Sequence, residues 1–242
     1  SWNWLANGAG SANTDGSINS TVSVNTISGF SIVRWSGSSA NATIGHGLNS
    51  VPKMIICKDT SATYNWGVYH ANLGNTKYLY LNSDAADGTS TSAWNDTTPT
   101  STVFSVGNAG ATNASGTNNM IAYCFAEKPG FSKFSSFVGN GDANGTFCFT
   151  GMKPNFLILK RLSSGMNWQV RDSARSPINP VTLMNKPNAN TAEQTADNVD
   201  FLSNGFKLRT TAAEANASGS NFIYMAFGQS LVGSNNVPCT AR

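Results

Sequence analysis

Short apolar runs and short alternating stretches, separated by turn residues, dominate the chain. Residues 54–57 (Met-Ile-Ile-Cys) and 120–126 (Met-Ile-Ala-Tyr-Cys-Phe-Ala) are continuous apolar runs. Runs of this length are typical of strands and too short for helices. Residues 21–25 and 66–70 alternate between apolar and polar side chains, as a strand with one buried face does. The pattern predicts an all-β fold.

The same series of segments occurs twice along the chain, at an offset close to 102 positions. A unit of about 100 residues is too long for a solenoid repeat and suits a complete β-sandwich. We therefore expect two tandem β-sandwich domains related by internal duplication. The expected domains are a leader over 1–28 with one possible strand, a first repeat over 29–128 and a second repeat over 129–242. The matched segments are 29–31 with 130–132, 52–58 with 154–160, 65–68 with 167–170, 78–81 with 181–184, Phe104 with Phe206, 113–116 with 216–219, and 120–126 with 222–228.

The composition agrees with this fold class. Asn, Ser and Thr make up 83 of the 242 residues, and only 11% of the residues are charged. Such side chains compete for backbone hydrogen bonds and disfavour helices, which excludes a helical bundle or coiled coil. Because 40% of the residues are hydrophobic, the chain is not a disordered one. Two polar loops, 82–102 and 185–200, are the expected contact regions, and the second could hold one short helical turn.

Charge and hydropathy narrow the possible partners. The net charge is +3 and the basic residues are scattered, whereas nucleic-acid binding concentrates positive charge on one element. No stretch approaches 18 apolar residues, so no membrane insertion is expected. The chain starts at Ser1 without an initiator Met, which suggests a piece of a longer polypeptide or a processed product.

The four cysteines and two histidines do not form a metal-binding pattern. No cysteine pair has CxxC spacing, so a zinc site is not expected, and no other metal or cofactor is expected either. Cys57, Cys124 and Cys148 lie within apolar strand-like runs. We interpret these three as small buried thiols.

Five residues are the candidate binding positions, each with a structural alternative. His46 stands between two glycines, and His70 ends a predicted strand. The second repeat places Thr150 and Asp172 at the corresponding positions, which favours a structural role for both histidines over a catalytic one. Trp66 and Trp168 match between the repeats. We expect them to pack on the core, with stacking on a carbohydrate as the alternative for Trp66, Trp168 and Trp94.

Several segments resemble a domain family of unassigned function that recurs in virion structural proteins of marine tailed bacteriophages. The similarity is carried by residues 14–26, 29–33, 45–48 (Gly-His-Gly-Leu) and 231–238. The resemblance implies a tail fibre, a head fibre or a capsid-decorating protein. It provides no catalytic residues, and no nucleophile, P-loop or metalloprotease motif occurs in the sequence.

The leading hypothesis is a non-enzymatic virion protein assembled in the bacterial cytoplasm. Its expected partners are copies of itself, for example in a trimer, other virion proteins, and a glycan of the host surface. Two alternatives stay open. One is a lectin-like carbohydrate-binding module that uses the tryptophans. The other is a glycan depolymerase, which needs two carboxylates about 5–9.5 Å apart in a groove.

Overall fold

The structure is a computed structural model that describes residues 3–115 and 119–230. Strands account for 45% of the chain and helices for 5%, so the prediction of an all-β fold is confirmed. By its contacts the chain divides into two compact units, residues 1–81 with 87–127 and residues 82–86 with 128–242. The motif at 231–238 and Cys239 lie outside the described residues.

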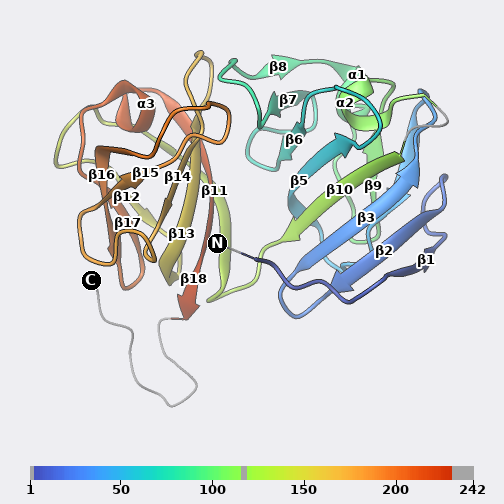
Figure 1. Cartoon of the computed structure of the whole chain (residues 1–242), viewed down its shortest axis with the longest axis horizontal. Coiled ribbons are helices and arrows are strands. Elements are labelled where there is room, and N and C mark those ends of the chain that lie inside the picture. The colour runs from blue at the N-terminus through green and yellow to red at the C-terminus, as the bar shows by residue number, and fades with distance from the viewer. Residues whose placement is uncertain (1–2, 116–118, 231–242) are drawn as a thin grey trace. The chain divides into compact units, whose positions relative to one another are not determined.

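Unit 1 is built on a large antiparallel sheet (Figure 1), whose strands run in the order β1-β2-β3-β10-β5-β6-β7-β8. The strand expected at residues 21–25 is present as β2, which lies next to β3. A second sheet consists of β4 and β9. The elements of this unit are β1 (Ser11–Asn13), β2 (Ser20–Asn25), β3 (Phe30–Ser36), β4 (Ala42–Gly45), β5 (Pro52–Asp59), β6 (Gly67–His70), β7 (Lys77–Tyr80), β8 (Gly88–Thr89), α1 (Thr91–Trp94), β9 (Val103–Val106), α2 (Gly110–Asn113) and β10 (Asn119–Ala126).

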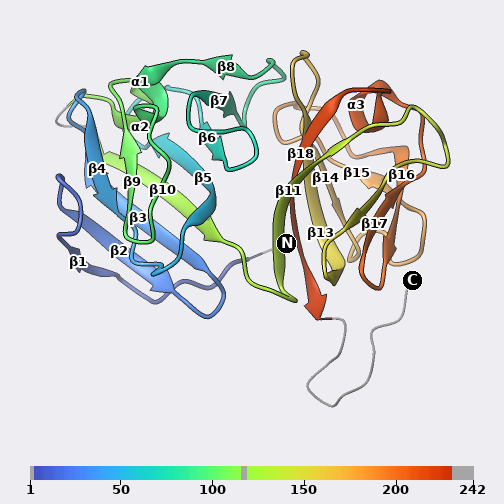
Figure 2. The same cartoon turned by 180° about the vertical axis from the view of Figure 1, so that it is seen from behind.

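The core of unit 1 lies between its two sheets. Figure 2 shows β4 and β9 over one face of the large sheet. Alternate side chains of β3, β5 and β10 point into this core, because successive residues of a strand face opposite sides. Ile44, Phe104 and Val106 enter it from the small sheet. The side chains of Trp35 and Phe104 meet edge to face, with ring centroids 5.7 Å apart.

Unit 2 has two four-stranded antiparallel sheets, β11-β18-β13-β14 and β12-β17-β16-β15. Its core contains apolar side chains from both sheets, among them Leu157 and Phe206. The helical turn considered for residues 185–200 is wrong, since residues from 194 onward pair with β15 and β17 as a strand. The elements are β11 (Ser132–Val138), β12 (Phe147–Phe149), β13 (Met152–Arg161), β14 (Gln169–Asp172), β15 (Val181–Met184), β16 (Gln194–Leu202), β17 (Gly205–Leu208), α3 (Ala213–Asn216) and β18 (Asn221–Ser230).

The central strand pairs of the two units share an irregularity. Between β10 and β5 the register shifts so that Lys53 has no partner across the ladder. Between β18 and β13 the register shifts at Asn155, which is 102 positions later. Such a bulge bends its strand and increases the local twist. The two central pairs therefore bend at corresponding positions.

A close backbone approach also recurs. A Cβ atom added to Gly37 would lie 2.0 Å from the carbonyl oxygen of Ala114, and one added to Gly139 would lie 2.4 Å from that of Ala217. Real Cβ atoms do not come so near to backbone oxygen. Only glycine fits at these two positions, where the end of the strand passes the end of a short helix.

Candidate functional site

His46 closes a turn inside unit 1. Its ring is fully buried, Nε2 donates to the carbonyl of Thr100 (3.2 Å), and Nδ1 accepts from the backbone N–H of Leu48 (3.2 Å). Burial lowers the pKa of the imidazole, so the neutral form is favoured at neutral pH. The corresponding residue of unit 2, Thr150, is also buried. The geometry gives His46 a structural role in the turn.

His70 and Asp172 perform the same task at the ends of β6 and β14. His70 is 1% exposed, and its Nδ1 accepts from the N–H of Asn72 at 3.2 Å. The Asp172 carboxylate accepts from the N–H of Ala174 at 3.0 Å. Both side chains therefore bond the backbone two residues further on and stabilise a turn.

The three candidate tryptophans differ in exposure. Trp94 and Trp168 are each 1% exposed, so neither presents a ring face on which a sugar could stack. Trp94 packs edge to face against Tyr69, with centroids 5.7 Å apart, and its indole N–H is buried without a hydrogen-bond partner among the described residues. Trp66 is half-buried and stacks on Tyr123 at 6.4 Å. Of the three, Trp66 keeps the largest exposed surface.

Unit 1 contains a half-open cavity of about 70 Å³. Tyr78 and Tyr80 from β7 form an aromatic wall, with ring centroids 5.1 Å apart. The predicted contact loop 82–102 supplies another part of the lining through Ser90 and Ala93. The pKa of Tyr80 is raised by burial and by its neighbour Tyr78. The remaining lining residues are Gly67, Ala109, Ala111 and Thr112.

Unit 2 holds a polar network at the corresponding place. Gln169 follows Gly67 by 102 positions, and Glu214 takes the place of Ala111 in the matching short helix. The Glu214 carboxylate pairs with Lys186 at 2.8 Å and accepts from Gln169 at 3.3 Å. Its pKa is lowered, because the bonds from Lys186 and its other donors outweigh the effect of burial. Longer polar side chains thus occupy in unit 2 the region that is hollow in unit 1.

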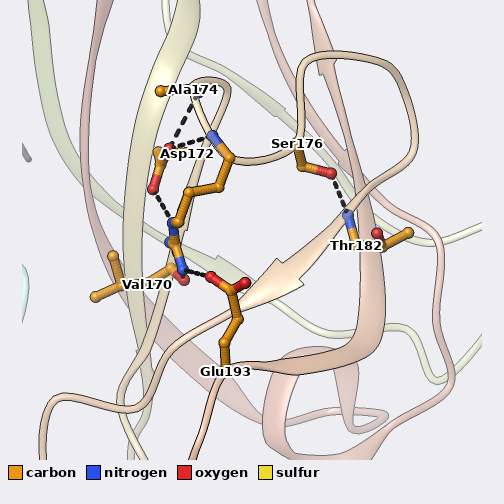
Figure 3. Close-up of polar contacts among 7 residues, drawn as sticks. Val170, Asp172, Ala174, Ser176, Thr182 and Glu193 are labelled. Atoms are coloured by element: carbon orange, nitrogen blue, oxygen red, sulfur yellow. Dashed lines mark hydrogen bonds and ion pairs between the residues drawn. The ribbon is translucent and has the colours of Figure 1, made fainter.

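Loop 185–200 also contributes to a second ionic contact (Figure 3). Arg175 lies between two carboxylates, with Nε 2.5 Å from Asp172 and Nη1 2.5 Å from Glu193. Burial alone would raise the pKa of Asp172, but the bonds from Arg175 and from backbone N–H groups outweigh burial and lower it. A general acid needs a raised pKa instead, so Asp172 is suited to holding a loop and unsuited to donating a proton.

The three thiols in the described part of the chain are buried and free of disulfide bonds, as the sequence predicted. Burial raises the pKa of Cys148 to about 12, and it also raises the pKa values of Cys57 and Cys124. A thiol must ionise to act as a nucleophile, so these three are unreactive at neutral pH. Residues 3–115 and 119–230 contain no cluster of three or more His, Cys, Asp or Glu side chains that could hold a metal. Within the same residues, no helix is long and apolar enough to cross a membrane.

One protein family matches almost the entire chain. It is described as a domain of unknown function, DUF7483, and its match spans residues 1–230. The chain belongs to this family. Comparisons with curated proteins and with solved structures give no significant match.

In this DUF7483 chain one buried side chain of unit 1 with several hydrogen bonds is an asparagine that is not among the five candidate residues. Asn113 is fully buried at the end of α2. Its Nδ2 donates to the carbonyls of Ala40 (2.7 Å) and Gly107 (3.0 Å), and its Oδ1 accepts from the N–H of Ser38 (3.0 Å). The amide joins the end of α2 to two other backbone segments, at 38–40 and at Gly107.

Asn216 repeats this arrangement at the end of α3. It is fully buried, and its Nδ2 donates to the carbonyls of Asp142 (2.9 Å) and Thr210 (2.8 Å). Its Oδ1 accepts from the N–H of Asn140 (3.0 Å). The recurring Asn-Ala-Ser-Gly segment, residues 113–116 and 216–219, was the signal in the sequence, but the match did not predict burial of the amide.

A lysine fixes the loop after the central strand in both units. Lys58 Nζ donates to the carbonyl oxygens one, four and six residues further on, at 2.8, 2.8 and 2.9 Å. The Nζ of Lys160, a fully buried residue, donates to those one and four residues further on, at 3.0 and 3.5 Å. These lysines and the two asparagines form what we call the repeated framework, residues Lys58, Asn113, Lys160 and Asn216.

Proposed function

We propose that the chain is a non-enzymatic structural protein of a virion, built from two tandem copies of one β-sandwich module that arose by duplication. One observation carries the structural part. Both units contain the repeated framework, whereas the side chains with catalytic potential differ between them: His46 corresponds to Thr150, and His70 to Asp172. What is duplicated is the set of contacts that shape the module.

The surroundings of the potentially reactive groups support the non-enzymatic part. Both histidines are buried in turns, three thiols have raised pKa values, and Asp172 and Glu214 are held as carboxylates by cationic partners. A mechanism needs a nucleophile, a base and a group that orients the base. Each of these side chains instead completes a local structural contact.

The location in a virion rests on the resemblance of segments such as 45–48 to structural proteins of marine tailed phages. We propose contact with neighbouring virion proteins, or with a glycan on the host surface, through residues 82–102, which include β8 and α1, and through residues 185–193, which precede β16. The first loop lines the cavity of unit 1, and the second contributes Lys186 and Glu193 to the ionic contacts of unit 2. These contacts hold both segments in place, which supports their proposed role as contact surfaces.

The location can be tested with antibodies raised against the purified chain. Immunogold electron microscopy of purified phage particles whose genome encodes the chain is expected to label a fixed site, either on the head or on the tail. Mass spectrometry of the same particles should detect its peptides after removal of soluble protein. Particles that carry neither label nor peptides would refute the virion assignment.

The tyrosine-lined cavity favours a second candidate function, binding of a small group of a glycan. Aromatic rings pack against the C–H faces of sugars, and Ser90 and Thr112 add hydroxyl groups to the lining. A cavity of about 70 Å³ would admit an acetamido group and not a complete sugar ring. Titration with N-acetylglucosamine, followed by NMR, should shift resonances of Tyr78 and Tyr80 in the wild type. Ala111→Met, which fills the cavity, should abolish the shifts, and a wild type without shifts would exclude this function.

A further inference from the structure

The two units each have a short edge strand, and the described residues cover the free side of only one of them. In unit 1 the edge strand β4 pairs with β9 on one side, with Ile44 opposite Phe104. In unit 2 the edge strand β12 pairs with β17, with Cys148 opposite Phe206. Ile44 of β4 and Cys148 of β12 are both buried in the cores of their units, so the two strands hold corresponding positions.

An extended segment of the leader covers the free side of β4. Ile18 forms a parallel bridge with Ile44, and its N–H donates to the carbonyl of Thr43 at 3.2 Å. Ser17 exchanges two bonds with Thr43: its N–H donates to the threonine Oγ1 (2.8 Å), and its Oγ accepts from the threonine N–H (2.9 Å). The edge of this module therefore accepts an added peptide segment.

The free side of β12 has no strand beside it among residues 3–115 and 119–230. It carries Phe147 and Phe149, which are 44% and 60% exposed. Val138, which is 54% exposed, lies nearby, because its carbonyl accepts from Thr146 just before the strand. Residues 143–151 contain no charged residue and no proline. Such residues are the usual protection of an edge against pairing, and this edge lacks it.

The leader of another copy does not fit this edge as it fits β4. A Cβ added to Gly45 would lie 1.7 Å from Oδ1 of Asn13 in the leader. Unit 2 has Phe149 at that position, so a large ring stands where the leader needs a glycine. A segment that pairs with the free side of β12 must instead present apolar side chains to Phe147 and Phe149.

We propose that β12 is a self-association surface, which pairs antiparallel with β12 of a second copy of this chain. Two-fold pairing centred on Cys148 places Phe147 of one copy opposite Phe149 of the other, twice. Aromatic pairs directly across an antiparallel ladder are stabilising, and the uncharged strand brings no like charges together. Because three residues on each side form a small interface compared with the usual 1,200–2,000 Å², the dimer is weak and depends on concentration.

This inference does not rest on the proposed function, whose partners are neighbouring virion proteins and a host glycan. Sedimentation equilibrium of the full purified chain, from micromolar to millimolar concentration, is expected to show a monomer–dimer equilibrium. Phe149→Lys should weaken dimerisation by at least about tenfold. The matched control is Ile178→Lys, which changes an isoleucine that is 73% exposed elsewhere in unit 2 and should leave the equilibrium unchanged. Thermal unfolding of both variants should confirm that they fold.

A charge exchange tests the pairing itself. The double variants F147K/F149K and F147E/F149E should each be monomeric, and an equimolar mixture should form a heterodimer. Three results would overturn the proposal: a wild type that is monomeric at every concentration, a Phe149→Lys variant that dimerises as well as the wild type, or a mixture that stays monomeric. Each can occur whether or not the chain is found in virions, so failure of this proposal is distinct from failure of the virion assignment.

Discussion

Unit 1 and unit 2 share a framework and differ in what surrounds it. In unit 1, small residues such as Gly67 and Ala111 leave a cavity next to two tyrosines. In unit 2, Gln169 and Glu214 fill the corresponding region with an ionic network. The difference shows which contacts the module requires and which it tolerates. The buried amide and the lysine that holds a loop occur in both units, whereas the chemistry around them changes from apolar to charged.

The largest expected effect is the loss of a framework asparagine. Asn113→Asp preserves the shape of the side chain but removes the donors to Ala40 and Gly107 and buries a carboxylate. We expect unit 1 to lose about 3–5 kcal/mol of stability, since several buried groups become unsatisfied at once. Hydrogen exchange followed by mass spectrometry would show which unit opens.

Asn216→Asp should have the same effect on unit 2, and Asn41→Asp, at an exposed position, is the control. If Asn113→Asp were as mild as Asn41→Asp, the repeated framework would not be what holds the module together.

A smaller but still large effect is expected for the lysines. Lys160→Met should destabilise unit 2 by about 2–3 kcal/mol, because carbonyl oxygens that accept from Nζ lose a buried charged donor. Lys58→Met should cost less, since Lys58 is only half-buried and water can replace the donor. Urea denaturation of both variants measures the difference. Equal losses would indicate that burial does not distinguish the two lysines.

The response to pH should separate the units. The pKa of His46 in unit 1 is lowered from its ordinary value of 6.5, so the folded state resists protonation. Its contribution to stability is complete above 6.5 and is lost as the pH falls below that value. In unit 2 the pKa values of Asp172 and Glu214 are lowered from 3.8 and 4.5. Their contribution is complete above those values and is lost only as the pH falls further.

Unit 1 should therefore weaken first on acidification. Hydrogen exchange at about pH 5.5 should show faster opening of unit 1 relative to pH 7.5, with little change in unit 2. His46→Gln retains a donor for the Thr100 carbonyl and should remove this acid sensitivity. If acidification accelerated hydrogen exchange more in unit 2 than in unit 1, the prediction that unit 1 is the more acid-sensitive unit would be wrong.

The smallest effect is expected for the outer half of the Arg175 contact. The side chain of Glu193 is 37% exposed, and ion pairs at the surface contribute about 0–1 kcal/mol. Glu193→Gln should change the melting temperature by little, and less at high salt than at low salt. Asp172→Asn should cost more, because Asp172 also accepts from the backbone of the following turn. If Glu193→Gln lowered the melting temperature as much as Asp172→Asn, the contact of Arg175 with the loop would be more important for stability than the turn.

The sequence was sufficient to predict strands and the all-β class. The apolar runs at 54–57 and 120–126 lie within β5 and β10, because their length and lack of charge suit central strands. The helical turn considered for residues 185–200 failed because tertiary pairing of β16 with β15, at Gln194 and Thr195, outweighed the local preference of an alanine-containing segment.

Candidate site residues were harder to assign from the sequence. Trp94 and Trp168 could have stood on the surface or in the core, and only the packing of distant strands decides between these positions. The role of Asn113 depends on groups 6 to 75 residues away, and no local pattern contains that information. The sequence offered one usable signal: an asparagine stands at the same place in the two matched series of segments, at residues 113 and 216, and in each unit it is a buried hydrogen-bonding centre.

The glycines at the strand ends have a consequence for finding relatives. Gly37 precedes Asn113 by 76 positions, and Gly139 precedes Asn216 by 77. Each glycine is required by the carbonyl that passes it, and each asparagine by the segments that it joins. Another domain that uses the same contacts should preserve a glycine and an asparagine at nearly this separation, even where every other side chain differs.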